Sequence, residues 1–181
     1  PVSVHAGMNG AGYIFLSDGT LQPVGDVNAS PPPDLGPIKQ LVHIPSRGWC
    51  GILPRDGSPV FWGNAAPPVI PLPSDLKDLI SMSIASGFGV ALQRDGTMTG
   101  WGQLATDQRY RIRKFTSATK VYHDYADRIF PVHRADHSWE LAPNPNIPEY
   151  AGEDRSSVVE GRLRGAIDAV FGRQFVIALR P

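Results

Sequence analysis

The sequence has one cysteine, no excess of charge of either sign and no long apolar run. Cys50 has no second cysteine to pair with, so a disulfide framework within the chain is excluded. The 17 basic residues balance 17 acidic ones, so no overall field attracts nucleic acid or an anionic membrane. A membrane-spanning helix needs about 20 consecutive apolar residues, and no run approaches that length. Composition therefore favours neither a nucleic-acid nor a membrane partner.

Catalytic patterns are also missing. No nucleophile and base, no pair of carboxylates and no glycine-rich phosphate loop followed by lysine has the required spacing. His133 and His137 lie near Asp136 and are of a type that binds metals. They flank an expected hairpin turn, however, so we interpret them as ordinary surface histidines. The sequence favours a non-enzymatic protein that uses no metal and no cofactor.

Glycine and proline, in contrast, are abundant, with 19 and 18 copies spread along 181 residues. Hydrophobic residues make up 41% and charged residues 19%, which is typical of a folded protein. Many glycines and prolines indicate many turns between short strands. We expect one sizeable domain, residues 1–181, with short strands and without long helices.

A repeat of about forty residues organises the chain. The Asp-Gly pairs that begin at Asp18, Asp56 and Asp95 are 38 and 39 residues apart. At the sixth position after the aspartate, the second and third copies have Trp62 and Trp101. The seventh position after each aspartate is glycine. We expect both tryptophans to pack between neighbouring units and the turn glycines to supply turn geometry.

Two weaker copies follow. The fourth turns at Asp136-His137 and carries Trp139 in its returning strand, and the fifth covers residues 167–179. The first copy has Val24 at the tryptophan position. The predicted repeat boundaries are approximately 2–41, 42–80, 81–119, 120–165 and, as a partial copy, 166–181.

Each Asp-Gly pair predicts a tight hairpin, because it stands between two apolar runs. The expected turn is of type I′, which needs a positive φ at both central residues. A further apolar stretch precedes every hairpin, as at residues 79–84. Three or four short strands in each period are typical of propeller blades. The predicted fold is all-β: a propeller-like array of about four to five four-stranded antiparallel blades.

The third copy combines Ala85-Ser86-Gly87, Asp95-Gly96-Thr97 and Trp101-Gly102. This combination resembles the repeats of the regulator of chromosome condensation family. The resemblance implies a propeller, commonly seven-bladed in that family. Its members include a guanine-nucleotide exchange factor, ubiquitin-ligase appendages, bacterial effectors and a secreted inhibitor of β-lactamases, so only the fold is implied reliably. About four and a half repeats fit here, which leaves three alternatives: a smaller propeller, a fragment of a larger one, or closure with a second copy.

The resemblance points to the turn before each inner hairpin as a binding position. The residues there are Asn9, Arg47, Trp49, Phe88, Tyr125, Asp127, Arg173 and Phe175. Aromatic residues and arginine are enriched at the centres of protein interfaces, so this set predicts a surface that binds a protein. The alternative is that Trp49, Phe88 and Phe175 face inward and fill a central channel.

Residues 109–115 alternate between basic and apolar side chains, which predicts a strand with one cationic face. Contacts to phosphates and stacking on bases are one interpretation of the strand's basic and aromatic residues, and a charge-protected edge strand is the other. The balanced net charge favours the edge strand. The candidate contact residues are Arg109, Tyr110, Arg111 and Arg113.

These patterns together predict a non-enzymatic module that recognises a protein partner through aromatic and arginine turns. A carbohydrate-binding lectin is one alternative, because tryptophan and tyrosine on propeller rims bind sugars. A guanine-nucleotide exchange or regulatory factor is another. If a blade is left open, pairing with another copy predicts a homo-oligomer.

Overall fold

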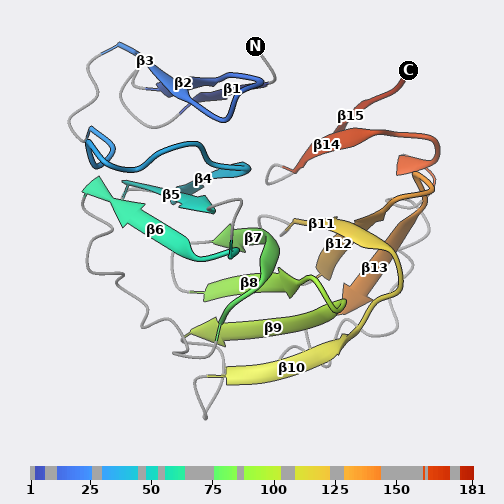
Figure 1. Ribbon diagram of the computed structural model, residues 1–181. Coiled ribbons are helices and arrows are strands. Elements are labelled where there is room, and N and C mark those ends of the chain that lie inside the picture. Colours follow the sequence, from blue (N-terminus) through green and yellow to red (C-terminus); the bar gives the residue numbers. More distant parts are fainter. Residues whose placement is uncertain are drawn as a thin grey trace. The chain divides into compact units, whose positions relative to one another are not determined.

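The computed structural model describes residues 3–6, 12–25, 30–44, 48–52, 56–63, 76–84, 88–102, 109–122, 129–143, 161, 163–171 and 176–181. Strands dominate these residues, and they form five antiparallel sheets (Figure 1). Within the described ranges, no helix is both long and apolar enough to cross a membrane. The chain divides into two compact units, Pro1–Leu79 and Ile80–Pro181.

The first unit contains two sheets of three strands each. Sheet 1 has the order β1 (Ser3–Ala6), β2 (Gly12–Phe15) and β3 (Leu21–Val24), and sheet 2 has the order β4 (Gln40–Ile44), β5 (Gly48–Ile52) and β6 (Pro59–Trp62). Tyr13 and Phe15 of sheet 1 form one buried cluster with Leu41 and Trp62 of sheet 2 and with Ile38 of the connector. The rings of Tyr13 and Trp62 meet edge to face, 6.3 Å apart. Trp62 therefore packs between neighbouring sheets, as the sequence predicted.

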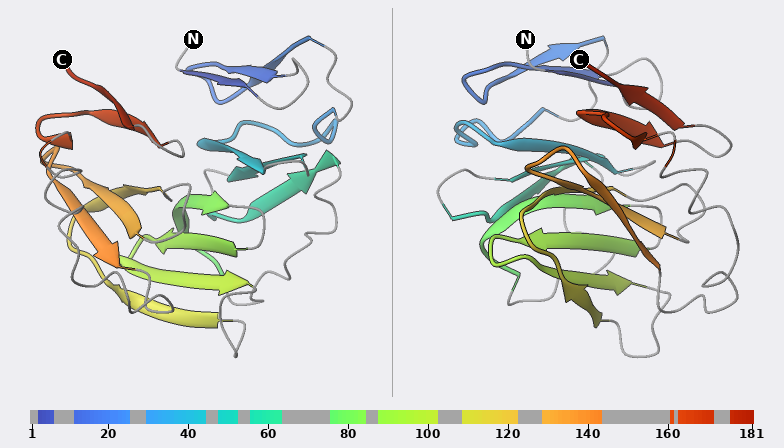
Figure 2. Two further views of the ribbon diagram at one scale, coloured as in Figure 1. Left: turned by 180° about the vertical axis from the view of Figure 1, so that it is seen from behind. Right: turned by 90° about the vertical axis from the view of Figure 1, so that its right-hand side faces the viewer.

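The second unit holds the other three sheets, apart from the first residue of β7, which ends the first unit (Figure 2). Sheet 3 has the order β10-β9-β8-β7, sheet 4 the order β11-β12-β13, and sheet 5 is the pair β14-β15. The strands are β7 (Leu79–Ile84), β8 (Phe88–Gln93), β9 (Thr97–Gly102), β10 (Arg109–Lys114), β11 (Ala118–Val121), β12 (Ile129–Arg134), β13 (Trp139–Pro143), β14 (Asp168–Phe171) and β15 (Val176–Leu179).

These strands confirm the all-β, propeller-like array that the repeat predicted. Sheet 3 is the one sheet with four strands in the described part of the chain, whereas the prediction gave every blade four. Val90 and Leu92 of sheet 3 share a buried cluster with Val121, Val132 and Ala142 of sheet 4. Within each unit, the face of one sheet thus packs on the face of the next.

The turns within the hairpins differ from the predicted type I′. Gly19 has a φ of 84°, but the φ of Asp18 is not positive. The amide of Gly19 donates to the carbonyl of Leu16, and the amide of Leu16 donates to the carbonyl of Thr20, both at 3.0 Å. This is a three-residue loop with glycine in the left-handed position. The turn therefore needs one glycine rather than two residues with positive φ.

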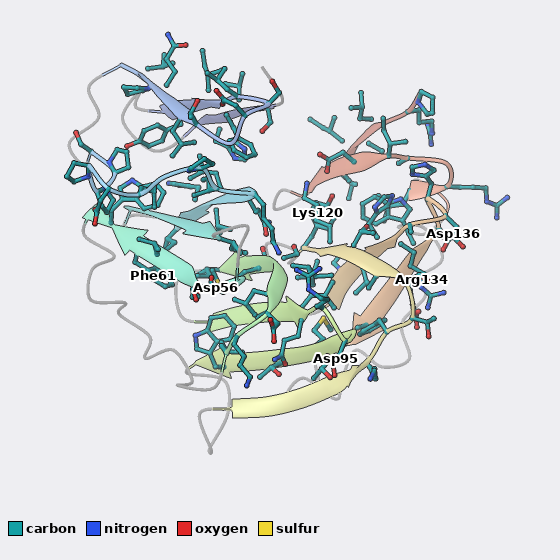
Figure 3. The ribbon with its side chains drawn as sticks, viewed as in Figure 1. Asp56, Phe61, Asp95, Lys120, Arg134 and Asp136 are labelled. Atoms are coloured by element: carbon teal, nitrogen blue, oxygen red, sulfur yellow. The ribbon has the colours of Figure 1, made fainter. Side chains whose placement is uncertain are left out.

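The aspartate of each turn binds the residue that follows the glycine. Asp18 Oδ1 accepts hydrogen bonds from the amide of Thr20 at 2.9 Å and from its hydroxyl at 2.7 Å. These bonds lower the pKa of Asp18 below its ordinary value. The same side-chain-to-amide bond recurs at the other turns, whose aspartates Figure 3 labels: Asp56 to Ser58, Asp95 to Thr97 and Asp136 to Ser138. In the fourth turn His137, with a φ of 62°, takes the place of the glycine.

The turns also contact the chain that leads to the following sheet. The amide of Ile38, just before β4, donates to the carbonyl of Gly19 at 2.8 Å. The amide of Phe115, which directly follows β10 and stands three residues before β11, donates to the carbonyl of Gly96 at 2.8 Å and continues the pairing of β10 with β9. Asp78, just before β7, donates in the same way to Asp56 at 3.0 Å. Each of the three bonds joins two residues of the same compact unit. The turn glycines face this contact, since a Cβ on Gly19 would lie 2.6 Å from the carbonyl oxygen of Ile38.

Replacing Gly19 by alanine should therefore destabilise the first unit by more than its positive φ alone explains. A left-handed conformation costs a residue with a Cβ about 1–2 kcal/mol, and the clash with Ile38 adds to it. Gly36 is a matched control, because its φ is 65° but an added Cβ would have nothing within 4 Å. Urea denaturation should show a loss for G19A of at least about 3 kcal/mol and for G36A of about 1 kcal/mol. Equal losses of unfolding free energy in G19A and G36A would show that the turn at Gly19 makes no close contact with Ile38.

Candidate functional site

Most of the predicted binding residues lie outside the described residues. This holds for Asn9, Arg47, Tyr125, Asp127, Arg173 and Phe175. Trp49 lies in β5 and Phe88 begins β8, but their side chains are outside the described set. The role of these residues in binding stays a prediction.

The chain positions of these residues nevertheless follow one rule. Each stands in the connection from the first to the second strand of a sheet, or at the start of that second strand. In an antiparallel sheet this connection lies at the end opposite the following turn. In sheets 1, 2 and 3 the strand ends that flank this connection therefore lie opposite the Asp-Gly turn.

The basic segment forms the strand β10, as predicted, and it is the outermost strand of sheet 3. Arg109 and Arg111 pair opposite Trp101 and Thr99. The register then shifts between Arg111 and Arg113. A bulge of this kind interrupts the two-residue alternation, so the single cationic face that the sequence predicted does not run along the whole strand.

The structure brings together a polar cluster that the sequence did not reveal, between sheets 4 and 5. His133 and Trp139 pair opposite each other in β12 and β13, at the positions that Leu92 and Met98 occupy in sheet 3. Both residues of sheet 3 are fully buried and apolar. Sheet 4 thus replaces an apolar pair by two residues that carry ring nitrogens. On the other face of sheet 4, Val121, Val132 and Ala142 pack against sheet 3.

Asp168, the first residue of β14, is the acceptor at the centre of this cluster. The ammonium of Lys120 donates to its two carboxylate oxygens at 2.9 and 3.2 Å, and the hydroxyl of Tyr122 donates to Oδ1 at 2.5 Å. The amide of Ala169 donates to the same oxygen at 2.8 Å. The ammonium of Lys120 also lies 4.8 Å from the centre of the Tyr122 ring. Three donors from two sheets thus converge on one carboxylate.

The ionisation of the cluster follows from these contacts. Burial raises the pKa of Asp168, but the hydrogen bonds from Tyr122 and Lys120 and the charge of Lys120 outweigh burial and hold the pKa below its ordinary value. Burial raises the pKa of Tyr122, and the adjacent Asp168 raises it further. At neutral pH the carboxylate is charged and the phenol is a hydrogen-bond donor. The arrangement suits a fixed ion pair rather than a general base at Tyr122.

Aromatic rings surround His133. Its ring centre lies 4.8 Å from that of Trp139 and 5.6 Å from that of His137. Tyr122 lies on the same tryptophan, with ring centres 5.3 Å apart. The indole Nε1 of Trp139 donates to the carbonyl of Ala166 at 2.9 Å, just before β14. The fourth sheet therefore holds the fifth through side chains rather than through a turn glycine.

His133 is only 8% exposed, so its interpretation as a surface histidine was wrong, whereas His137 is exposed. The Thr119 hydroxyl donates to the His133 carbonyl and lies 3.1 Å from Nδ1, which fits a protonated Nδ1. Nε2 is buried and has no hydrogen-bond partner among the described residues. Burial lowers the pKa of His133, and His137 lowers it further. No three His, Cys, Asp or Glu side chains of the described ranges lie close enough to hold a metal ion.

Comparisons with known proteins support the fold. No protein-family model matches the sequence, and no curated protein sequence does so. Among solved structures, the CRINKLY WD40 ectodomain of the receptor kinase ACR4 from Arabidopsis thaliana is similar, with a TM-score of 0.50 and 17% identity. The match covers 78% of this chain and 49% of that ectodomain, so the chain spans about half the length of its structural neighbour. At this identity the likeness shows a propeller-type fold and nothing of activity.

Replacing Asp168 by asparagine should weaken the junction of sheets 4 and 5 in a pH-dependent way. At neutral pH the loss should be about 1 kcal/mol, because the carboxylate is partly exposed and solvent screens the pair. Since the folded-state pKa of Asp168 lies below its ordinary value, its contribution is present above that ordinary value and is lost as the pH falls through the folded-state value. D168N should lack this part of the acid sensitivity. Urea denaturation across this pH range measures both effects.

The matched control for D168N is the exposed Asp34 of the first connector, replaced in the same way. D34N should keep the neutral-pH stability of the wild type, because Asp34 is exposed. A D168N variant with the unchanged acid profile would contradict the assignment of the carboxylate as the charged centre of the junction.

Proposed function

We propose that this chain is a non-enzymatic recognition module of the type found in the regulator of chromosome condensation family, and that it binds a protein partner. The contact surface in this proposal is formed by the connections between the first and second strands of the sheets. The proposal is supported by the residue types that the sequence has at this one position in every copy of the repeat. Six of the eight are aromatic or arginine, the residue types that dominate protein interfaces.

The turns support this assignment of the surface. At the Asp-Gly end, the backbone of the first three turns is occupied by bonds to the connections that lead to the following sheets. The opposite connections vary in length and sequence from copy to copy. Variable connections held by a fixed scaffold are where recognition residues are usually found. Substitutions in such connections can change the binding specificity without disturbing the strands.

In this proposal the polar cluster between sheets 4 and 5 has a structural role. Lys120 and Tyr122 are both engaged by Asp168, and Trp139 is engaged by Ala166. Groups that already satisfy one another offer little to a substrate. Within the described residues, the cluster therefore favours a scaffold for binding over a catalytic centre.

The proposal predicts that truncating Arg47 and Trp49 together weakens partner capture by at least about tenfold. The immobilised chain is used to capture proteins from a lysate of its source, and the retained proteins are compared by quantitative mass spectrometry. R94A is the matched control, because Arg94 is an exposed arginine in an Asp-Gly turn, at the other end of its sheet. The single variant R47A separates binding from folding. Trp49 pairs opposite Trp62, so replacing Trp49 can affect folding, whereas R47A leaves that pair intact.

The same set of proteins retained at the same level by the wild type and by a folded R47A/W49A variant would refute the proposed surface. A glycan array tests the alternative directly. Saturable binding to defined sugars, lost in the same variant, would replace the protein partner by a carbohydrate.

A further inference from the structure

Three side chains form a row across the face of sheet 4 that holds sheet 5. Lys120 of β11 pairs opposite His133 of β12, and His133 pairs opposite Trp139 of β13. Residues that pair directly across antiparallel strands project from the same face of a sheet. Lys120 binds the carboxylate of Asp168 in β14. The indole of Trp139 donates to the carbonyl of Ala166, just before that strand. His133 therefore lies between two side-chain contacts that join the sheets.

The contacts of His133 suit a neutral ring. The side chain is 8% exposed, and its Nε2 is buried and has no hydrogen-bond partner among the described residues. The hydroxyl of Thr119 donates to the carbonyl of His133 and lies 3.1 Å from Nδ1, so its oxygen can accept the Nδ1 proton. Nε2 then carries a lone pair. A proton added there creates a buried, charged donor for which the described residues supply no acceptor, and such groups are costly.

The titratable groups around His133 come from three elements. In the described part of the chain they are Lys120 and Tyr122 in or just after β11, Asp136 and His137 in the turn after β12, and Asp168 in β14. Lys120 lies directly opposite His133, where a second positive charge destabilises a sheet. Asp168 attracts a proton but is already paired with Lys120, and Asp136 lies in an exposed turn, where solvent screens it. Burial and the charge of His137 hold the pKa of His133 below its ordinary value.

Sheet 3 shows that this position of the repeat does not need a polar residue. The pair at the corresponding places of β8 and β9 is Leu92 and Met98, and both side chains are fully buried. Leucine is similar in size to histidine and has no group that binds a proton. The histidine of sheet 4 thus adds a proton-binding group at a place where the repeat also accepts an apolar side chain.

We propose that His133 makes the junction between sheets 4 and 5 sensitive to pH, so that binding of a proton at Nε2 loosens sheet 5. The added charge lies in the row between Lys120 and Trp139, the two residues that hold sheet 5. It repels the ammonium of Lys120, which binds Asp168. It also needs an acceptor or water, which the ring gains when sheet 5 moves away from sheet 4. The loosened junction therefore binds the proton more tightly than the closed one.

The junction is expected to weaken in mildly acidic solution. An ordinary histidine titrates at about pH 6.5. Because the pKa of His133 is lower in the folded protein, the stability that the neutral ring provides is present above about pH 6.5 and is lost as the pH falls through the folded-state pKa. The carboxylate of Asp168 is still charged in this range, because its own pKa lies below its ordinary value. The effect of His133 therefore precedes that of Asp168 on acidification.

Hydrogen exchange followed by NMR on the whole 181-residue chain measures the loosening. Protection factors, which are corrected for the pH dependence of intrinsic exchange, should fall by at least about threefold between about pH 7.5 and about pH 5. The amides to follow are those that pair β14 with β15, and that of Ile167, which donates to the carbonyl of Leu179. H133L should remove most of this fall and leave sheet 5 better protected than the wild type at the lower pH.

H137N is the matched control, because His137 is exposed and asparagine readily adopts its positive φ. This variant keeps His133 and its burial, which is the largest cause of the lowered pKa, so the fall in protection should persist. NMR titration of the His133 ring in the wild type is a second measurement that needs no variant. Its midpoint should lie below that of an ordinary histidine.

Protection of sheet 5 that is the same at both pH values would overturn the proposal. So would an equal fall in the wild type and in a folded H133L variant. A His133 ring that titrates at about pH 6.5 or above would do the same, since the ring of Trp139 would then be stabilising the cation. None of these outcomes requires a binding partner, so the test is independent of the proposed recognition function.

Discussion

The turn that closes each of the first three hairpins is hydrogen-bonded to a residue in the connection that leads to the following sheet. In the first unit the amide of Ile38 donates to Gly19, and in the second the amide of Phe115 donates to Gly96. Both glycines have positive φ, and neither has room for a Cβ. One glycine therefore meets two requirements, the geometry of the loop and the close approach of the next strand. The spacing of the repeat follows, since the connector must return the chain to this point.

The fourth junction satisfies the same requirement with different chemistry. His137 replaces the turn glycine, and the contact to the next sheet passes to Trp139 and to the ion pair between Lys120 and Asp168. Such a junction can be modified by charge and pH, whereas a backbone contact cannot. The apolar pair of sheet 3 has become His133 and Trp139 at this place. The hairpins are thus alike, whereas the contacts that join one sheet to the next differ in their chemistry.

The sequence was sufficient to predict the strands, the hairpins and the position of Trp62, because all three depend on local patterns that recur. It failed for the turn type, since the side chain of Asp18 binds Thr20 and leaves the left-handed conformation to Gly19 alone. It also failed for the pair of Lys120 and Asp168, which are 48 residues apart and share no motif. One signal of the polar cluster was available in the sequence. When the fourth copy is aligned on the third, His133 stands at the position of the apolar Leu92.

Amide hydrogen exchange followed by NMR tests the turn contact most directly. The amides of Ile38, Asp78 and Phe115 lie just outside the strands, so without the contact they would exchange as connector amides do. The bonds to the turns predict that all three are protected as strongly as the amides of the adjacent strands, and that Gly36 is not. Exchange at Ile38 and Phe115 as fast as at Gly36 would contradict the account.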